Sequence, residues 1–215
     1  MRGLLAGLVL MLAVPAMSVA AGPKVYDKPI LSLLGHIEGP DGYDELSGFI
    51  RHTPPKPISQ LTIREVLEFQ RKVRKAGAKS SAVGKYQFIY ETLNRLVARH
   101  RIDPGQKLDA RTQDFLARML LNDCNYYDAT ADTTEIGNCV ATVWAAFPVL
   151  TGKRAGKSYY HGIAGNRALT TVSIMRAIIG NRMVPPVDLR RQSVISAGPV
   201  VWPEDGKFAD KVPLR

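Results

Sequence analysis

Hydrophobic residues recur every three or four positions over most of the chain, which is the spacing of amphipathic helices. The segments with this spacing are about 27–38, 62–75, one that begins near 86, about 109–122, one with Thr134 as its expected N-cap, and about 166–179. The sequence therefore predicts a mainly α fold.

Capping residues support several of these boundaries. Gly39-Pro40 follows Glu38 and should stop the first helix, because proline cannot continue it. Thr62 and Glu65 form a capping-box pattern at the start of the second helix. In the helix expected over 109–122, the residues predicted to face inward are Phe115, Leu116, Met119 and Leu120.

The segment 41–57 follows the first helix and is rich in Gly, Pro and polar residues. We expect a long loop there, with or without a short β-hairpin, that forms a small lobe. Loops of this length inside compact domains are often functional. From 183 to 215, repeated prolines and scattered charges predict an extended C-terminal tail, which either binds a partner such as an envelope complex or is disordered.

Residues 1–20 have the pattern of a secretory signal peptide. Arg2 precedes an apolar run over 4–17, and 18–21 supplies small residues for cleavage. The run is short for a membrane span, and a retained N-terminal anchor is the alternative. We therefore expect a periplasmic or secreted protein with a folded domain over 21–182 and no stable membrane insertion after cleavage.

The chain is basic, with 29 Lys and Arg against 19 Asp and Glu and a formal net charge of +10. Such charge favours an anionic polymer as partner. Export, and the lack of any RNA- or DNA-binding motif, argue against nucleic acid, so the bacterial wall is the expected partner. The basic run over 71–75 indicates a solvated helix face that could also touch the wall.

The chain contains two cysteines, Cys124 and Cys139. In an oxidising compartment they could close a disulfide, which for a loop of that length is worth on the order of 3 kcal/mol. Two buried free thiols are the alternative. No Cys or His lies at ligand spacing around either residue, so we expect no metal site. No motif indicates a cofactor.

Glu38 is the residue best placed to carry chemistry. A glutamate that ends an apolar helix beside a long loop can lose solvent, which raises the pKa of its carboxyl and suits it to general acid catalysis. The negative end of the helix dipole would act in the same direction. A solvated helix-end glutamate is the alternative.

A second pattern runs from Ser80 to Ile89. Small residues lead through Gly84, which permits a close backbone approach, to Tyr86 and Gln87. An aromatic ring and an amide are groups that hold sugars, although a simple turn into a helix explains the segment equally well. Trp144 lies on an apolar helical stripe, where a core position is favoured over a sugar platform.

These blocks, in this order, resemble the bacteriophage lambda lysozyme type of lytic transglycosylase and a wider group of phage-derived muramidases. Ile37-Glu38-Gly39, followed by Gly42-Tyr43-Asp44, looks like the catalytic glutamate block of that family. The segment 80–89 is similar to its Gly-Arg-Tyr-Gln segment, and 144–148 to its Trp-Ala-Ser-Leu-Pro block. Segments 61–66 and 156–160 look like elements of the wider muramidase group. The resemblance covers roughly residues 30 to 180.

The resemblance implies a lysozyme-like fold and cleavage of the β-1,4 linkage between MurNAc and GlcNAc in the glycan strands of peptidoglycan, with Glu38 as the catalytic residue. The resemblance, together with the aromatic and amide groups of segment 80–89, also implies a set of substrate-binding residues. These are Tyr43, Ser81, Lys85, Tyr86, Gln87 and Tyr160. The chain departs from the family's pattern at Lys85, where the family has Arg, and at Val83 and Phe147.

The number of carboxylates separates the possible mechanisms. A hydrolytic lysozyme usually pairs its acid with a second carboxylate, for which Asp41, Asp44 and Glu45 are the candidates. The two aspartates can instead brace the loop. A lytic transglycosylase needs one carboxylate, which acts first as acid and then as base and leaves 1,6-anhydro-MurNAc. The resemblance favours this mechanism; a hydrolytic muramidase and a catalytically inactive wall-binding or assembly protein are the alternatives.

Overall fold

The computed structural model describes residues 24–184. The expected signal peptide over 1–20 and the tail from 185 onward lie outside the described residues. The helices are α1 (Lys28–Glu38), α2 (Ile63–Lys75), α3 (Tyr90–His100), α4 (Ala110–Asp123), α5 (Thr133–Val143) and α6 (Val172–Gly180). Short 3-10 turns occupy Gly42–Asp44, Ile58–Gln60 and Gly152–Arg154, and the two strands are β1 (Lys24–Val25) and β2 (Met183–Val184). The prediction of a mainly α fold is confirmed.

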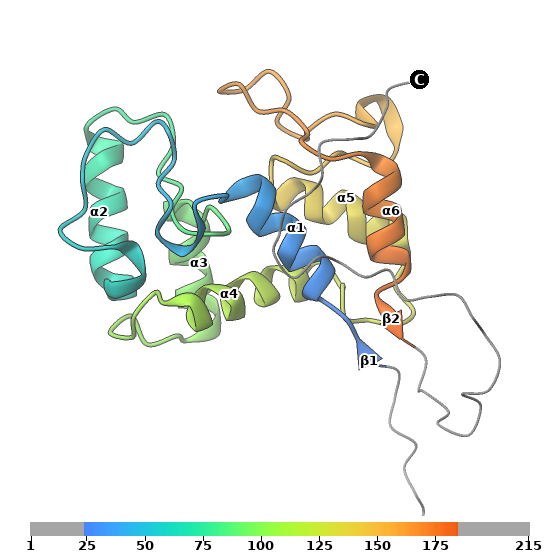
Figure 1. Cartoon of the computed structure of the whole chain (residues 1–215), viewed down its shortest axis with the longest axis horizontal. Coiled ribbons are helices and arrows are strands. Elements are labelled where there is room, and N and C mark those ends of the chain that lie inside the picture. Colours follow the sequence, from blue (N-terminus) through green and yellow to red (C-terminus); the bar gives the residue numbers. More distant parts are fainter. Residues whose placement is uncertain (1–23, 185–215) are drawn as a thin grey trace, which may run out of the picture. The chain divides into compact units, whose positions relative to one another are not determined.

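A pair of helices lies on each side of α1. In Figure 1, α2 and α3 lie on one side, α5 and α6 lie on the other, and α4 passes below α1. Within each pair the helices pack against each other, and α1 also contacts α6. The C-terminal end of α1 points towards the α2–α3 side, so the last residues of this helix lie between the two pairs.

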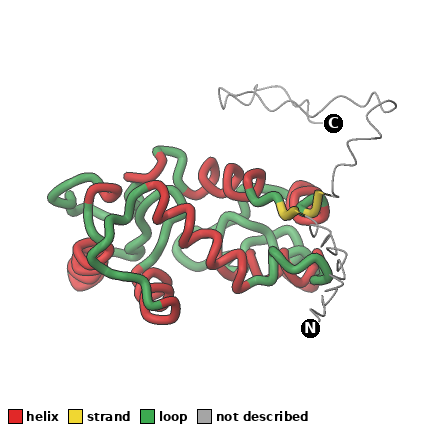
Figure 2. The backbone as a smooth tube through the Cα atoms, turned by 90° about the horizontal axis from the view of Figure 1, so that it is seen from below, coloured by secondary structure: helices red, strands yellow, loops and turns green. Residues whose placement is uncertain are grey.

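Among residues 24–184, regular strand structure is confined to one antiparallel pair. β1 and β2 join the two ends of the described chain, with Lys24 opposite Val184 and Val25 opposite Met183. Figure 2 shows this pair beside helices and long loops. Because β2 pairs with β1, the fold continues two residues past the expected boundary at 182.

The loop between α1 and α2 is held by single contacts rather than by a hairpin of its own. Gly42–Asp44 forms a 3-10 turn, and Leu46 forms an isolated antiparallel bridge with Val83. Asp44 Oδ1 accepts a hydrogen bond from the Ser59 N–H at 2.7 Å. Within 41–57 the small lobe is therefore loop, and its one bridge is to a distant segment.

The capping box predicted for α2 is confirmed. Thr62 Oγ1 accepts from the Glu65 N–H at 3.2 Å, and Glu65 Oε2 accepts from the Thr62 N–H at 2.7 Å. The expected N-cap of α5 was two residues too late. Asp132 takes that position, because its carboxylate accepts from the N–H groups of both Thr134 and Glu135.

Two other helices start later than predicted. α3 begins at Tyr90 rather than near Tyr86, because Val83 and Phe88 exchange backbone hydrogen bonds across a tight turn that excludes helix. α6 begins at Val172 rather than near 166, where Thr171 caps it by accepting from the Ile174 N–H. In both cases a local turn or cap overrode the apolar spacing.

One hydrophobic cluster runs through all six helices. On α4 its members Leu116 and Leu120 are buried as predicted, and Met119 packs against it partly buried. The inward placement of Phe115 was wrong, since 45% of this residue is exposed. The buried stripe of α4 instead includes Gln113, Ala117 and Leu121, which have helical spacing with Leu116 and Leu120.

A disulfide joins Cys124, at the end of α4, to Cys139 in α5. The bond closes a loop with a sequence separation of 15 residues. It therefore links the helix that passes below α1 to the helix pair on one side of the groove described below.

We expect the Cys124→Ala/Cys139→Ala variant to lose about 3 kcal/mol of unfolding free energy, because its unfolded chain is no longer constrained by the loop. Urea unfolding with and without reductant measures this. Reductant should shift the wild-type midpoint to that of the variant and leave the variant unchanged, since the chain has no other cysteine. Equal midpoints for both oxidised proteins would contradict the expectation.

Candidate active site

Glu38 is the last residue of α1 and lines a groove of about 1310 Å³. The groove passes between the α2–α3 side and the α5 side, and its lining includes Ser81, Gln87 and Trp144 as well as Glu38. The placement agrees with the sequence expectation that the helix-ending carboxyl faces a cleft.

The carboxyl of Glu38 is fixed by one backbone hydrogen bond. Its Oε1 atom accepts from the Ala146 N–H at 2.9 Å, across 108 positions of sequence. The side chain is largely withdrawn from solvent, and this desolvation raises the pKa of the carboxyl above its usual range, although the hydrogen bond from Ala146 opposes the shift. The protonated form is favoured compared with an ordinary glutamate, as general acid catalysis requires.

The backbone of Lys85 lies directly against Gly39, the residue after Glu38. A Cβ atom on Gly39 would lie 2.5 Å from the Lys85 carbonyl oxygen and 2.7 Å from its Cα. Real Cβ contacts are longer, so only glycine allows this approach. The contact brings the 84–87 turn to the end of α1.

Two hydrogen bonds from backbone N–H groups hold this turn to neighbouring segments. The Gly84 N–H donates to the Glu45 carbonyl at 2.7 Å, and the Lys85 N–H donates to Gln113 Oε1 at 3.0 Å. Gln113 Nε2 in turn donates to the Tyr43 and Leu108 carbonyls. Gly84 has a φ of 76°, and a side chain there would clash with Gln113. The buried amide of Gln113 thus joins the turn to α4 and to the 42–44 segment.

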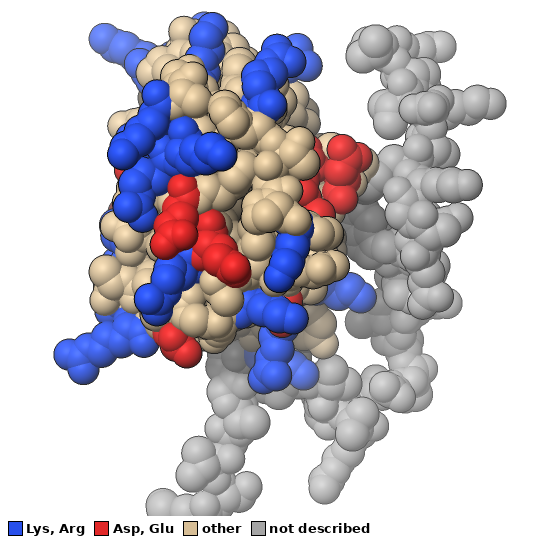
Figure 3. All heavy atoms as spheres, turned by 90° about the vertical axis from the view of Figure 1, so that its left-hand side faces the viewer, with Lys and Arg blue, Asp and Glu red and all other residues tan. Residues whose placement is uncertain are grey.

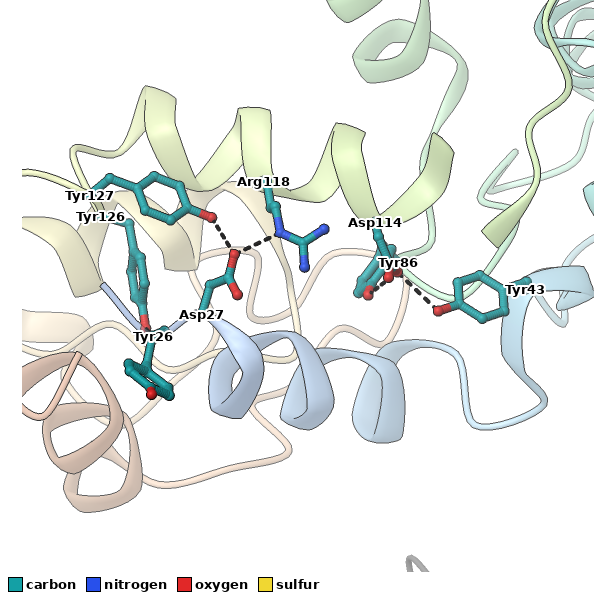
Figure 4. Close-up of polar contacts among 8 residues, drawn as sticks. All are labelled: Tyr26, Asp27, Tyr43, Tyr86, Asp114, Arg118, Tyr126 and Tyr127. Carbon is teal, nitrogen blue, oxygen red and sulfur yellow. Dashed lines mark hydrogen bonds and ion pairs between the residues drawn. The ribbon is translucent and has the colours of Figure 1, made fainter. Parts of the chain in front are cut away.

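A carboxylate on α4 binds two of the predicted site tyrosines behind the groove. Asp114 Oδ1 accepts from the hydroxyls of Tyr86 at 2.6 Å and Tyr43 at 3.0 Å, as Figure 4 shows. Desolvation, reinforced by Asp114, raises the pKa of Tyr43 to about 12 and also raises that of Tyr86. Both hydroxyls therefore act as neutral donors that fasten the turn to α4.

The same face of α4 makes a second polar contact with the start of α1. Asp27 Oδ2 accepts from Arg118 Nε at 2.7 Å and from the Tyr127 hydroxyl at 2.9 Å (Figure 4). The Asp27 contact fixes the start of α1 against α4. The Asp114 contact fixes the 84–87 turn, which lies against the other end of α1, to the same helix. Together they set the position of Glu38 relative to the turn.

The predicted binding residues divide into two groups. Ser81, Tyr86, Gln87 and Tyr160 line the groove with Glu38, whereas Tyr43 and Lys85 are not among its lining residues. The Lys85 ammonium lies 4.8 Å from the centre of the Tyr43 ring and 3.3 Å from its hydroxyl oxygen. As placed, these two residues contact each other rather than the space beside Glu38.

Most groove residues from the prediction also have structural partners. Tyr86 is 1% exposed, and Ser81 Oγ accepts from the Tyr90 N–H at the start of α3. Tyr160 donates its hydroxyl proton to the Thr142 carbonyl at 2.6 Å. Trp144 is buried and donates to the Tyr86 carbonyl at 3.1 Å, which agrees with the favoured core position.

Gln87 is the half-buried polar side chain of the turn. It has a φ of 47°, a left-handed conformation that is uncommon for a residue with a side chain. Its Nε2 donates to the Gly84 carbonyl at 2.9 Å, which closes the turn and places the side chain on the groove. The strained backbone and the groove position coincide at this residue.

Two of the three candidate second carboxylates, those of Asp44 and Glu45, brace the loop. Glu45 Oε2 accepts from the Asp41 N–H at 2.6 Å, and Asp44 caps the turn at Ser59. None of the three acidic residues 41, 44 and 45 is among the lining residues of the groove. The other carboxylates of the lining, Glu91 and Asp123, form ion pairs with Arg74 and Arg99. In the described part of the chain, Glu38 is therefore the groove carboxylate without an ion pair.

Sequence reasoning missed three groups that build the site. These are the Ala146 N–H, the Gln113 amide and the Asp114 carboxylate. A buried amide, Gln70, also donates to the Ser81 and Phe88 carbonyls on the flanks of the turn. One signal was available, because Gln113 is a polar residue on the apolar stripe of its helix.

Among residues 24–184, no group of three or more His, Cys, Asp or Glu side chains is arranged to hold a metal ion. No helix in this part of the chain combines the length and apolarity that a bilayer crossing needs. Comparisons with protein-family models, curated proteins and solved structures found no match.

We expect Gly39→Ala to destabilise the fold by about 1–3 kcal/mol, because the added methyl group must push the Lys85 backbone away from α1. Urea unfolding measures the loss. Gly48→Ala is the matched control, since a Cβ at Gly48 meets no atom within 4 Å. Equal unfolding free energies for the two variants would show that the close approach is not a constraint.

We expect Glu38→Gln to be more stable than the wild type at neutral pH. Since the folded protein holds the Glu38 proton more tightly than the unfolded chain does, wild-type stability falls as pH rises from the usual carboxyl pKa of 4.5 through the raised value. Glutamine removes this pH-dependent loss and keeps an acceptor for Ala146.

Urea unfolding at acidic and neutral pH tests this expectation. The two proteins should converge below the usual carboxyl pKa and separate above it. Glu68→Gln, on the exposed face of α2, is the control for loss of a negative charge. A wild-type protein that is the more stable of the two at neutral pH would contradict the burial argument.

Proposed function

We propose that this protein is a peptidoglycan lytic transglycosylase of lysozyme-like fold, exported to the periplasm or beyond. It would cleave the β-1,4 linkage between MurNAc and GlcNAc. The observation that carries the proposal is the single desolvated carboxyl of Glu38 in a large groove, free of ion pairs and held by one backbone donor. The position of this acid at the end of the first helix, between two helical lobes, supports the lysozyme-like assignment.

In the first step Glu38 acts as a general acid. The Ala146 N–H binds Oε1, which leaves Oε2 to carry the proton towards the groove. The carboxyl protonates the glycosidic oxygen as the bond from that oxygen to MurNAc C1 breaks, and the GlcNAc-bearing fragment leaves with a free hydroxyl. The raised pKa keeps a larger share of the carboxyl protonated near neutral pH.

In the second step the Glu38 carboxylate acts as a base. It removes the proton of the MurNAc C6 hydroxyl while that oxygen bonds to C1, which closes the 1,6-anhydro ring. The carboxyl regains its proton, and no water is consumed. One carboxylate therefore performs both transfers, and the Ala146 hydrogen bond stabilises its charged form between them.

The positions and hydrogen bonds of the neighbouring acidic residues favour the transglycosylase mechanism over hydrolysis. A hydrolase usually employs a second carboxylate as nucleophile or as base for water. Asp41, Asp44 and Glu45 lie outside the groove lining, and Asp44 and Glu45 accept hydrogen bonds from loop backbone. A hydrolytic muramidase would have to activate water without them.

The catalytic test is zymography on purified bacterial wall. We expect wild-type protein to clear the gel and Glu38→Gln to be slower by about 10²–10⁴-fold, the usual contribution of general acid catalysis. Glu68→Gln should clear like the wild type. Clearing by Glu38→Gln at the wild-type rate would exclude Glu38, and no clearing by any of the proteins would favour a non-catalytic wall-binding role.

Mass spectrometry of the released fragments distinguishes the two enzymatic mechanisms. A transglycosylase leaves anhydro-MurNAc ends, which are one water lighter than reducing ends. Digestion in heavy-oxygen water provides the control, because only hydrolysis would introduce the label. Labelled reducing ends without anhydro product would make the protein a hydrolytic muramidase.

A further inference from the structure

The groove that contains Glu38 has two chemically different walls. The wall built from α2, α3 and the segment between them contributes six basic side chains: Arg71, Arg74, Lys75, Lys79, Arg95 and Arg99. The opposite wall, built from α5 and the loops that follow it, contributes uncharged residues: Cys139, Thr142, Val143, Ala145, Tyr160, Ile163, Ala164 and Asn166. The positive charge of the groove is thus confined to one side.

Acidic side chains neutralise only part of the basic wall. Glu91 pairs with Arg74 at 2.7 Å, and Asp123 pairs with Arg99 at 3.0 Å. Arg71, Lys75, Lys79 and Arg95 form no ion pair within residues 24–184 and are exposed. Figure 3, which faces the α2 side of the molecule, shows Lys and Arg side chains gathered around a smaller acidic group.

The unpaired charges come from several positions on two helices and on the segment between them. Arg71 and Lys75 lie one turn apart on α2, Lys79 follows that helix, and Arg95 lies in the middle of the neighbouring α3. Because α2 packs against α3, these residues belong to one surface. Several cations from different positions on one wall suit a polymer that carries anionic groups at intervals better than they suit one small anion.

We propose that this basic wall binds the carboxylates of the peptide stems attached to the glycan strand. The inference rests on the proposed function, in which the polymer is peptidoglycan. The sugar backbone is largely uncharged and matches the uncharged wall, where Tyr160 and Ile163 offer ring and apolar surface. Binding of the stems on one side fixes which way the strand lies across Glu38, and makes stem-bearing glycan the preferred substrate.

The experiment compares binding to two forms of one polymer: purified native sacculi with free stem carboxylates, and the same sacculi after those carboxylates have been converted to amides. Both are prepared free of covalently attached phosphate polymers. All proteins carry Glu38→Gln, so that binding is measured without turnover. The wall variant is Arg71→Gln/Lys75→Gln/Arg95→Gln, and the control variant Arg64→Gln/Lys107→Gln/Arg111→Gln removes the same charge from exposed positions outside the groove.

We expect the parent and control proteins to bind native sacculi about tenfold more tightly than amidated sacculi, the size expected for three exposed ion pairs. The wall variant should lose this preference and bind both forms as weakly as the parent protein binds amidated sacculi. Added salt should reduce the preference of the parent protein. Equal binding of the parent to both forms, or an equal loss in the wall and control variants, would overturn the proposal.

Competition with free stem peptide identifies the anionic group. The peptide should displace the parent protein from native sacculi, whereas the same peptide with its carboxylates amidated should not. Equal displacement by both peptides would overturn recognition of the carboxylates.

Cleavage by proteins with intact Glu38 separates this inference from the proposed function. Clearing of both sacculi at equal rates would overturn stem recognition and leave the transglycosylase proposal standing. Loss of stem preference in the wall variant, together with no cleavage by any protein, would retain the binding wall and remove the proposed activity.

Discussion

The close approach of Gly39 to the backbone of Lys85 is the constraint on which the site depends. Because no side chain stands between them, the end of α1 and the 84–87 turn touch directly. The turn then presents Gln87 to the groove that contains Glu38, while its other contacts reach Glu45, Gln113 and Asp114 through the hydrogen bonds around it. A longer distance here would separate the acid from the residues that surround it.

Two residues of the site, Glu38 and Gln87, have locally unfavourable features. Glu38 lies at the negative end of a helix dipole and is withdrawn from solvent, and both features disfavour its charged form. Gln87 adds a left-handed backbone conformation. The surrounding core and the buried Gln113 amide hold both residues in place. Such concentration of unfavourable features is expected where chemistry, rather than packing, selects the residues.

The groove contains two kinds of group that can interact with a ligand or with Glu38. Near Glu38 the backbone of Ala146 provides a neutral, directional donor, whereas the α2–α3 wall provides a diffuse positive field. A short-range hydrogen bond can position one carboxyl, and exposed cations act over the Debye length of about 8 Å in physiological salt. The acid and the basic wall can therefore act on different parts of one polymer.

The sequence by itself determined the mainly α class, four helices to within about two residues, the α2 capping box, and Glu38 as the end of an apolar helix, because these follow from local spacing and caps. It misplaced Phe115 and the start of α3, since apolar spacing does not report helix rotation or a tight turn. Tertiary structure alone decided that Ala146 binds Glu38 and that Asp114 binds Tyr86 and Tyr43. It also separated Lys85 and Tyr43 from the groove lining. The reason is physical: desolvation and hydrogen bonding depend on groups up to 108 positions apart, and no local pattern encodes which of them meet.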